Sequence, residues 1–422
     1  MKFKKTTLPN GLRVVTVPTE GNPAVTVMIL VESGSNYETK EQSGLSHFLE
    51  HMVFKGTKRR PNTLDISREM DELGAEHNAF TANEFTGFWA KGESRHFKKL
   101  LDILADMYLN PTLSEEEMEK ERGVIIQEIL MYEDMPQHKV GRLFLELMYG
   151  DAPAGRFITG PAENVKKFTR KDLEDYRAGH YVADNTIVVV AGDIEDSEVK
   201  TEVMKTLGEI ERKRKPVKPA VKEEQKAPAL LVHKKKTDQT HMILGFHAFN
   251  ALDKRMPALQ VLASILGRGM SSRLFHKLRN EMGACYYVSA SADDYSDYGY
   301  FGIATGVESQ RIEEVTKVIL AECIKLMREA VPPEELQKAK EYLSGRLYLG
   351  LETTDSLAEF YGVQEAIKHM IEKPEEVERD IRAVSAEDVQ NVAREIFRAE
   401  KLNLAVVGDI EDEARLEKLL VI

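Results

Sequence analysis

The segment His47-Phe48-Leu49-Glu50-His51 places two imidazoles and a carboxylate within five residues. Ser43-Gly44 before it and Gly56 after it suit the ends of a helix of about three turns. Residues four apart on a helix are separated by about 40° around the axis and roughly 6 Å along it. The two histidines can therefore converge on one metal ion, with Glu50 beside them as the base for an activated water. Chance alone predicts ~0.03 such patterns in a chain of this composition. A helix whose histidines form hydrogen bonds inside a core remains the alternative.

A catalytic zinc ion usually takes three protein ligands, so this site needs one from elsewhere in the chain. Glu128 is the best candidate, because it interrupts an apolar helix face between Ile126 and Ile129, where an unpaired carboxylate would be costly. Glu121 lies seven residues earlier and points only about 20° away around the same helix. It could accept a hydrogen bond from a ligand histidine. The alternative for Glu121 is solvated surface, since it follows the acidic run 115–119.

The chain contains an internal repeat that must build the frame around these residues. The segments NTIVVVAGDIED (185–196) and KLNLAVVGDIED (401–412) are both apolar strands ending in the same five residues, with Gly192 and Gly408 216 residues apart. The same offset relates Thr169 and Ser385, each suited to cap the helix that follows. A single long period of this kind indicates duplication of a domain rather than a solenoid.

We therefore predict an α+β fold with two homologous domains, each a mostly antiparallel sheet with helices packed on one face. The predicted domains are 1–212, which carries the metal site, and 228–422. The charged stretch 213–227 is the predicted linker, because it lacks apolar periodicity. The amphipathic pattern predicts helices over 95–109, 114–134, 162–178, 253–266, 310–329 and 332–350.

Composition narrows the classes of partner. The formal net charge of −12 argues against nucleic acid, which requires a basic face. No stretch approaches the roughly 20 apolar residues of a membrane span, so no membrane partner is expected. The two cysteines, Cys285 and Cys323, are too few and too far apart for a disulfide framework or a cysteine zinc site. No secretion signal is recognisable at the N-terminus, and we expect a cytoplasmic protein.

Several motifs together give the chain a family resemblance. NGLRVV, GLSHFLEHMVFKGT, GAEHNAFTANEFT, ERGVIIQEI and the repeated GDIED resemble the pitrilysin-type inverted-zincin peptidases, a family that includes insulin-degrading enzyme and mitochondrial processing peptidase. The resemblance covers nearly the whole chain and is nearest to short two-domain bacterial members. It implies a third zinc ligand 76 or 77 residues after the second histidine, and Glu128 follows His51 by 77. It also implies a functional acid seven residues before that ligand, which is Glu121.

The resemblance assigns further residues to the site. An arginine and a tyrosine seven apart, here Arg279 and Tyr286, are implied to reach the substrate from the C-terminal domain. Their guanidinium and phenol groups suit a substrate carbonyl and the oxyanion of a tetrahedral intermediate. Asn78, Ala79 and Phe80 are implied to lie on an exposed strand edge that could bind an extended peptide. Spacing alone leaves these as a surface helix residue, a core edge and an ordinary edge strand.

The predicted function is a zinc metalloendopeptidase with one Zn²⁺ per chain and Glu50 as its general base. Peptides or unfolded proteins are the predicted substrates, and a homodimer is the predicted assembly. One alternative is a peptidase that processes presequences, which would share every catalytic residue. Another is a non-catalytic structural or assembly homologue, which would tend to lose the zinc ligands. A metal-storage module fits less well, because one three-ligand site beside a base is poorly suited to storage.

Overall fold

The computed structural model describes residues 2–422, which form two compact units. The first unit takes in the described residues up to Ile129 together with Arg156–Pro219 and Leu349–Lys373. The second takes in Leu130–Gly155, Ala220–Tyr348 and Pro374–Ile422. Each unit thus combines most of one half of the sequence with a segment of the other half. The stretch 213–227, the predicted linker, contains no helix or strand. The domain ranges 1–212 and 228–422 stay a prediction.

The first unit is built on a six-stranded sheet with the order β1-β2-β6-β3-β5-β4. The only parallel pair in this sheet is β2 with β6, as far as the described residues go. The strands are β1 (Lys4–Thr7), β2 (Arg13–Pro18), β3 (Ala24–Val31), β4 (Glu76–Thr81), β5 (Thr86–Glu93) and β6 (Thr186–Gly192). The helices are α1 (Leu45–Val53), α2 (Thr63–Glu72), α3 (Phe97–Leu109), α4 (Glu115–Asp134, up to Ile129 in this unit), α6 (Ala162–Val165), α7 (Arg170–His180), α8 (Asp196–Leu207) and α12 (Thr354–Lys368).

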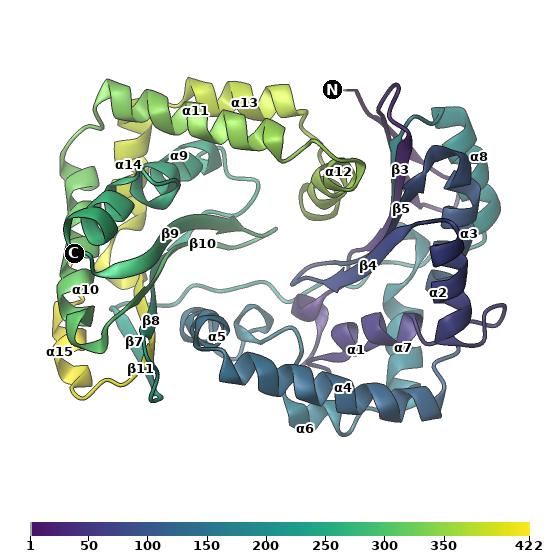
Figure 1. Cartoon of the computed structure of the whole chain (residues 1–422), viewed down its shortest axis with the longest axis horizontal. Coiled ribbons are helices and arrows are strands. Elements are labelled where there is room, and N and C mark those ends of the chain that lie inside the picture. The colour runs from purple at the N-terminus through teal and green to yellow at the C-terminus, as the bar shows by residue number, and fades with distance from the viewer. Residues whose placement is uncertain (1) are drawn as a thin grey trace. The chain divides into compact units, whose positions relative to one another are not determined.

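Helices cover both faces of this sheet. Successive side chains of a strand point to opposite faces, and Val27 and Ile29 of β3 share a core with residues of α1 and α3. Leu30 follows Ile29 and therefore points to the opposite face, where it meets α12. Gly362 of α12 approaches it so closely that an added Cβ would lie 2.6 Å from Leu30 Cδ1 and 3.0 Å from Val189 Cγ2. In Figure 1, α12 and α3 lie on opposite sides of β3 and β5.

The second unit repeats the arrangement with five strands in the order β7-β11-β8-β10-β9. The pair β11–β7 is parallel and the other pairs are antiparallel. The strands are β7 (Ala229–Lys234), β8 (Thr240–Ala248), β9 (Cys285–Asp294), β10 (Gly299–Val307) and β11 (Leu402–Gly408). The helices are α5 (Pro136–Tyr149), α9 (Met256–Gly267), a π-helix (Phe275–Glu281), α10 (Ile312–Arg328), α11 (Pro333–Leu349, up to Tyr348 in this unit), α13 (Pro374–Ala383), α14 (Ala386–Ile396) and α15 (Glu413–Leu419).

Helices α5 and α12 each belong to the unit that is built mainly from the other half of the sequence. Leu404 and Val406 of β11 face the core that contains α9, α10 and α14. Ala405 and Val407, which alternate with them, pack with residues of α5. Helix α5 begins at residue 136 and α12 at residue 354, which is 218 residues later and close to the offset of the repeat. Each half therefore contributes an equivalent helix to the unit built mainly from the other half.

The predicted fold class is confirmed, with two mostly antiparallel sheets of equivalent order and their helical layers. The exchanged helix on the second face of each sheet adds to that prediction. Both predicted helix caps are present as capping boxes, Thr169 with Asp172 and Ser385 with Asp388. Cys285 and Cys323 are free thiols. Within residues 2–422, no helix has the length and apolar character needed to cross a membrane.

Candidate metal centre

Helix α1 presents the histidines because its start is held from a distance. Gly44 precedes the helix with a φ of +101°, and an added Cβ would lie 2.6 Å from the Thr159 carbonyl oxygen, so glycine is required there. The buried Glu38 carboxylate accepts hydrogen bonds from the backbone N–H groups of Gly44 (2.8 Å) and Ser46 (2.6 Å). Glu38 therefore satisfies the helix N-terminus that no local side chain caps.

The core stripe of α1 fixes which side carries the chemistry. Leu45, Phe48, Leu49, Met52 and Val53 follow the i, i+3, i+4 pattern of an amphipathic helix and are almost fully buried. This stripe packs in the core of the first unit. The other side of the helix carries the two histidines and Glu50.

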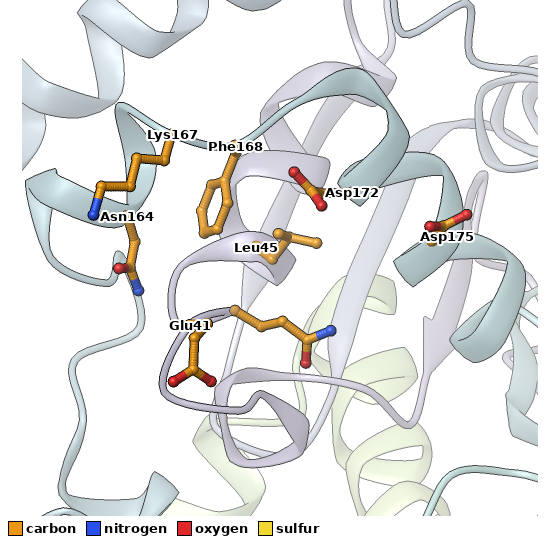
Figure 2. A pocket seen from close by; sticks show the side chains of 8 residues that line it. Glu41, Leu45, Asn164, Lys167, Phe168, Asp172 and Asp175 are labelled. Carbon is orange, nitrogen blue, oxygen red and sulfur yellow. The ribbon is translucent and has the colours of Figure 1, made fainter.

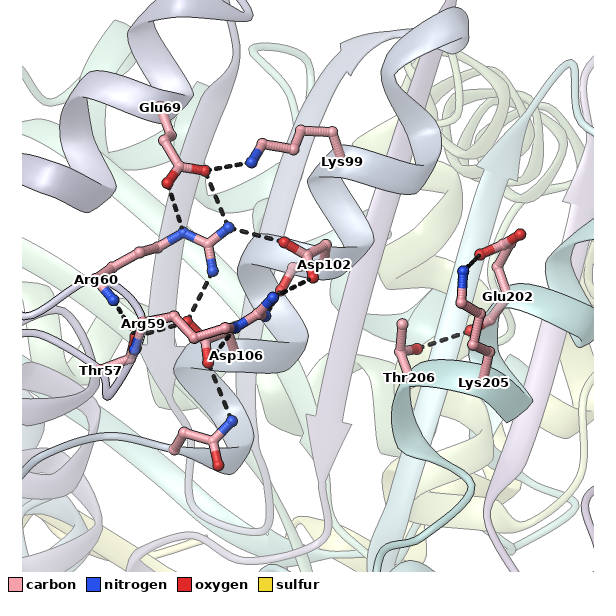
Figure 3. Close-up of polar contacts among 11 residues, drawn as sticks. Thr57, Arg59, Arg60, Glu69, Lys99, Asp102, Asp106, Glu202, Lys205 and Thr206 are labelled. Carbon is pink, nitrogen blue, oxygen red and sulfur yellow. Dashed lines mark hydrogen bonds and ion pairs between the residues drawn. The ribbon is translucent and has the colours of Figure 1, made fainter.

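The loop after α1 is fixed by a partly buried ion network (Figure 3). Arg60, only 4% exposed, pairs with Asp106 (2.7 Å), Asp102 (2.8 Å) and Glu69 (2.9 Å). Thr57 donates a hydrogen bond of 2.5 Å to Asp106. The loop is thus tied to α3, and the C-terminal end of the histidine helix cannot shift freely.

Helix α4 lies beside α1 (Figure 1), and two of its carboxylates approach the histidines. Glu121 belongs to the buried stripe of α4, which also contains Met118, Ile125 and Ile129. Its Oε2 atom lies 3.0 Å from His51 Nδ1. Glu121 is therefore not solvated surface, the alternative that the sequence left open.

The atoms of three residues are arranged as a metal site requires. One potential ligand atom from each of His47, His51 and Glu128 lies within 4.8 Å of the others. Glu128 Oε2 is 3.5 Å from His47 Nε2 and 3.6 Å from His51 Nε2. Two ligands at 2.0–2.1 Å from a tetrahedral zinc are about 3.4 Å apart, so these spacings fit, as does the donor set of two imidazoles and a carboxylate.

The electrostatics of the cluster favour a cation at the same place. Burial acts to lower the pKa of His51, but its contacts with Glu121 and Glu128 outweigh burial and raise this pKa to about 9. Burial also opposes ionisation of Glu121, yet its hydrogen bonds with His51 and Lys55 outweigh burial and lower the pKa of Glu121. Burial lowers the pKa of His47, and the charge of His51 lowers it further. A divalent cation would supply positive charge where the two carboxylates favour it.

The two histidines differ in their second hydrogen bond. A ligand histidine normally donates its other ring N–H to an acceptor, which fixes its tautomer. For His51 that acceptor is Glu121. The Nδ1 atom of His47 is buried and has no hydrogen-bond partner among residues 2–422. The support for the site is therefore concentrated on His51.

Glu50 lies on the same side of α1 and has a partner on strand β4. Thr81 Oγ1 donates a hydrogen bond of 2.6 Å to Glu50 Oε2. Burial raises the pKa of Glu50, and the hydrogen bond from Thr81 opposes that rise. A carboxylate with a raised pKa accepts a proton more readily than an ordinary glutamate, as a general base requires.

Strand β4, which contains Asn78, Ala79 and Phe80, is the terminal strand of the first sheet. The three residues do not share a face. Ala79 is buried in the core that includes α1, whereas Phe80 contacts Gly87 and Phe85 on the other side. A peptide added to this strand would pair with its backbone, so the orientation of these side chains does not block such binding.

Arg279 and Tyr286 belong to the second unit, on the π-helix and on β9. The Arg279 guanidinium lies 4.9 Å from the ring centroids of both Phe275 and Tyr286. Tyr286 is 73% exposed. The structure thus brings the predicted pair together, and the Arg279 guanidinium also lies over the Phe275 ring.

A hollow of about 350 Å³ on the first unit lies away from this chemistry (Figure 2). Its lining residues are Glu41, Gln42, Leu45, Asn164, Lys167, Phe168, Asp172 and Asp175. Leu45 points about 200° around α1 from His47, because each residue turns the helix by 100°. We assign this hollow no part in the site.

Three supporting residues were not predicted from the sequence: Glu38, Lys55 and Thr81. Lys55 Nζ lies 2.6 Å from Glu121 Oε1. A weak signal existed for Lys55, because a residue four after His51 would share its side of a continuing helix, although α1 ends at Val53. Thr81 lies two residues after Ala79 and therefore on the same face of β4. Glu38 gave no local signal, because its partners lie six and eight residues away across a loop.

Both halves of the chain contain a match to a known protein family. Residues 13–162 match the family described as Insulinase (Peptidase family M16). Residues 167–343 match the domain described as Peptidase M16 inactive domain. The three residues of the potential metal site all lie within the first match.

The similarity to known proteins extends over nearly the whole chain. An "uncharacterized zinc protease" of Bacillus subtilis is 35% identical over 96% of this chain and 98% of its own length. Another from Streptomyces coelicolor is 32% identical over 97% of this chain and 90% of its own length. The crystal structure of a protease from Helicobacter pylori has a TM-score of 0.92 at 24% identity, covering 96% of this chain and 99% of that one. At that identity the structure shows the fold alone.

Proposed function

Because this chain belongs to peptidase family M16, we propose that it is a zinc-dependent endopeptidase that hydrolyses peptide bonds in short or unfolded polypeptides. Relatives named zinc proteases support the peptidase role and the choice of metal. The observation that carries the proposal is the convergence of His47, His51 and Glu128, with Glu50 on the same side of α1.

In this proposal His47, His51 and Glu128 hold one zinc ion per chain. Zinc, when bound, polarises the scissile carbonyl and lowers the pKa of the attacking water. Glu50 accepts the proton of that water and then passes it to the leaving nitrogen. Glu121 accepts a hydrogen bond from His51 Nδ1, which leaves Nε2 of that ring with its lone pair free for the metal.

The substrate is proposed to bind as an extended strand. The backbone of β4 around Asn78, Ala79 and Phe80 can pair with a peptide, which gives affinity without strong sequence choice. Arg279 and Tyr286 are proposed to bind the substrate carbonyl and stabilise the oxyanion. That role rests on the family resemblance. The mutual packing of these two side chains with Phe275 supports it by limiting the conformations of the guanidinium.

The name of the second matched domain contains the word inactive, which bears on the alternative of a non-catalytic homologue. That match begins at residue 167, after all three potential ligands. Within residues 2–422, the one cluster of three side chains that could hold a metal ion lies in the first match. The word inactive therefore suits the half without such a cluster, and the proposal of a catalytic first half stands.

The test combines metal analysis with cleavage of a quenched fluorescent peptide by the wild type and by Glu50→Gln. We expect about one zinc per chain in both proteins and a loss of activity in Glu50→Gln of about 10²–10⁴-fold. Glu72→Gln, at an exposed position of α2, is the matched control and should retain full activity. Equal activity in the wild type and Glu50→Gln would overturn the mechanism, and a wild type without zinc would overturn the metal assignment.

The substrate class and the assembly need their own measurements. The proposal expects a short or unfolded chain to be cut faster than a stably folded protein, and equal rates would contradict it. A processing peptidase would instead cut presequences at one defined bond and leave other unfolded chains intact. The homodimer remains a proposal, and sedimentation showing a fully active monomer would remove it.

A further inference from the structure

One face of strand β4 lies against the helix that carries the proposed base. His77, Ala79 and Thr81 alternate along the strand and so share a face. The rings of His77 and Phe54, just after α1, have centroids 6.2 Å apart. Ala79 is buried in the core shared with α1, and Thr81 bonds to Glu50. The strand that offers its edge to a peptide is thus in direct contact with the base.

The contact between Thr81 and Glu50 fixes the orientation of the carboxylate. The hydrogen bond is short, 2.6 Å, and it engages Oε2. With Oε2 engaged in this way, Oε1 is the oxygen that can accept the proton of a water molecule. Two features fix the hydroxyl itself. Threonine is stiff about χ1 because it is β-branched, and the Thr81 backbone is paired with Thr86 of β5.

We propose that Thr81 is a positioning residue that couples peptide binding on β4 to the orientation of Glu50. This inference rests on the proposed function of the site. Strand β4 already holds the Thr81 hydroxyl against Glu50 without a peptide. A peptide that pairs with the outer edge of β4 adds backbone hydrogen bonds to that strand and so strengthens the contact that aims the base at the attacking water. Such an interaction contributes to the chemical step rather than to binding alone.

The test uses two substitutions that separate the hydroxyl from the rest of the side chain. Thr81→Val keeps the shape and strand preference but removes the donor, whereas Thr81→Ser keeps the donor. We expect Thr81→Val to lower kcat by about 10–100-fold with KM within about twofold of the wild type, since misorientation of a catalytic group costs up to about 10²-fold. Thr81→Ser should restore kcat to within about threefold of the wild type. Zinc content and melting temperature should be unchanged in both.

The control is Thr201→Val on α8, where an exposed hydroxyl bonds to the Ser197 carbonyl and nothing of the site is touched. Wild-type kcat in Thr81→Val would overturn the inference. An equal loss in Thr81→Val and Thr81→Ser would overturn it too, since the methyl packing rather than the hydroxyl would then matter. A rise in KM with unchanged kcat would reduce Thr81 to a binding contact and overturn the coupling. A wild type that cleaves no peptide would overturn the proposed function itself, which separates the two failures.

Discussion

Glu38 offers a test of how the histidine helix is held, because it is a buried acid that caps α1 from outside the helix. It is 2% exposed and accepts two backbone hydrogen bonds, from Gly44 and Ser46. Burial raises the pKa of Glu38 to about 7, against the lowering effect of the hydrogen bonds and of Arg156. Tyr176 is the other titratable group that faces it, and burial keeps that phenol protonated at neutral pH.

The sign and size of the effect follow from proton linkage. Between pH 4.5 and pH 7 the folded chain keeps a proton on Glu38 that the unfolded chain has released. The free energy of unfolding therefore falls as pH rises through this window. A shift from 4.5 to about 7 corresponds to about 3 kcal/mol, at 1.36 kcal/mol for each unit. The contribution is fully present below pH 4.5 and is lost by about pH 7.

Glu38→Gln removes the titration while keeping the size of the side chain. We expect the free energy of unfolding of Glu38→Gln, relative to the wild type, to rise by about 3 kcal/mol between pH 4.5 and pH 8. Urea unfolding followed by circular dichroism at a series of pH values measures this difference, and Glu20→Gln at an exposed position is the control. A difference between Glu38→Gln and the wild type that does not change with pH would refute the reasoning.

Two further substitutions test contacts within the first unit. Lys55→Met keeps the length of the side chain but removes the charge 2.6 Å from Glu121, so we expect zinc affinity to fall by about 10-fold or more in chelator competition. Lys58→Met, at an exposed position of the loop after α1, should leave the zinc affinity unchanged. A zinc affinity of Lys55→Met equal to that of the wild type would contradict the role of Lys55. Gly362→Ala forces a Cβ to within 2.6 Å of Leu30, so we expect a loss of about 1–3 kcal/mol in the free energy of unfolding. Gly123→Ala, in a helix with open space around it, should raise the free energy of unfolding. A rise in that free energy for Gly362→Ala as well would show that packing on α12 is not tight.

The sequence predicted best what depends on spacing along one helix. His47, Glu50 and His51 share a side of α1 because positions three and four apart do so on any helix. Glu121 and Glu128 share a side of α4 for the same reason. Bringing α1 and α4 together was a step that spacing alone could not make. The carboxylate of Glu128 on an apolar helix face suggested it, and the family resemblance supported it. The repeat similarly predicted two equivalent sheets, because both copies keep the same strand endings.

Contacts between distant segments carry no signal of this kind. Thr81 is an ordinary strand residue until β4 is placed over α1, and only then does its hydroxyl meet Glu50. Glu38 follows a buried turn, and its partners become visible only when the loop closes on the start of the helix. Each of these residues supports the site through a hydrogen bond to a residue on another element or on the far side of a loop. A sequence pattern with a period of two or 3.6 records which face a residue occupies but not what lies opposite it.

The exchanged helices show the same limit at the level of the fold. An amphipathic helix such as α12 records in its sequence that one face is buried, and its equivalent α5 does the same. Both sheets offer an apolar face, so hydrophobic periodicity is satisfied equally by either sheet. The choice depends on specific complementarity, such as Gly362 against Leu30 and Val189 in the first unit and the packing of Phe144 against Gly245 in the second. At Gly245 an added Cβ would lie 2.5 Å from the Phe144 ring, so a small residue stands where the helix approaches the sheet in both units. The assignment of each helix to its sheet is therefore encoded in a few close contacts, and a search for paired small and large residues would be the way to find it from sequence.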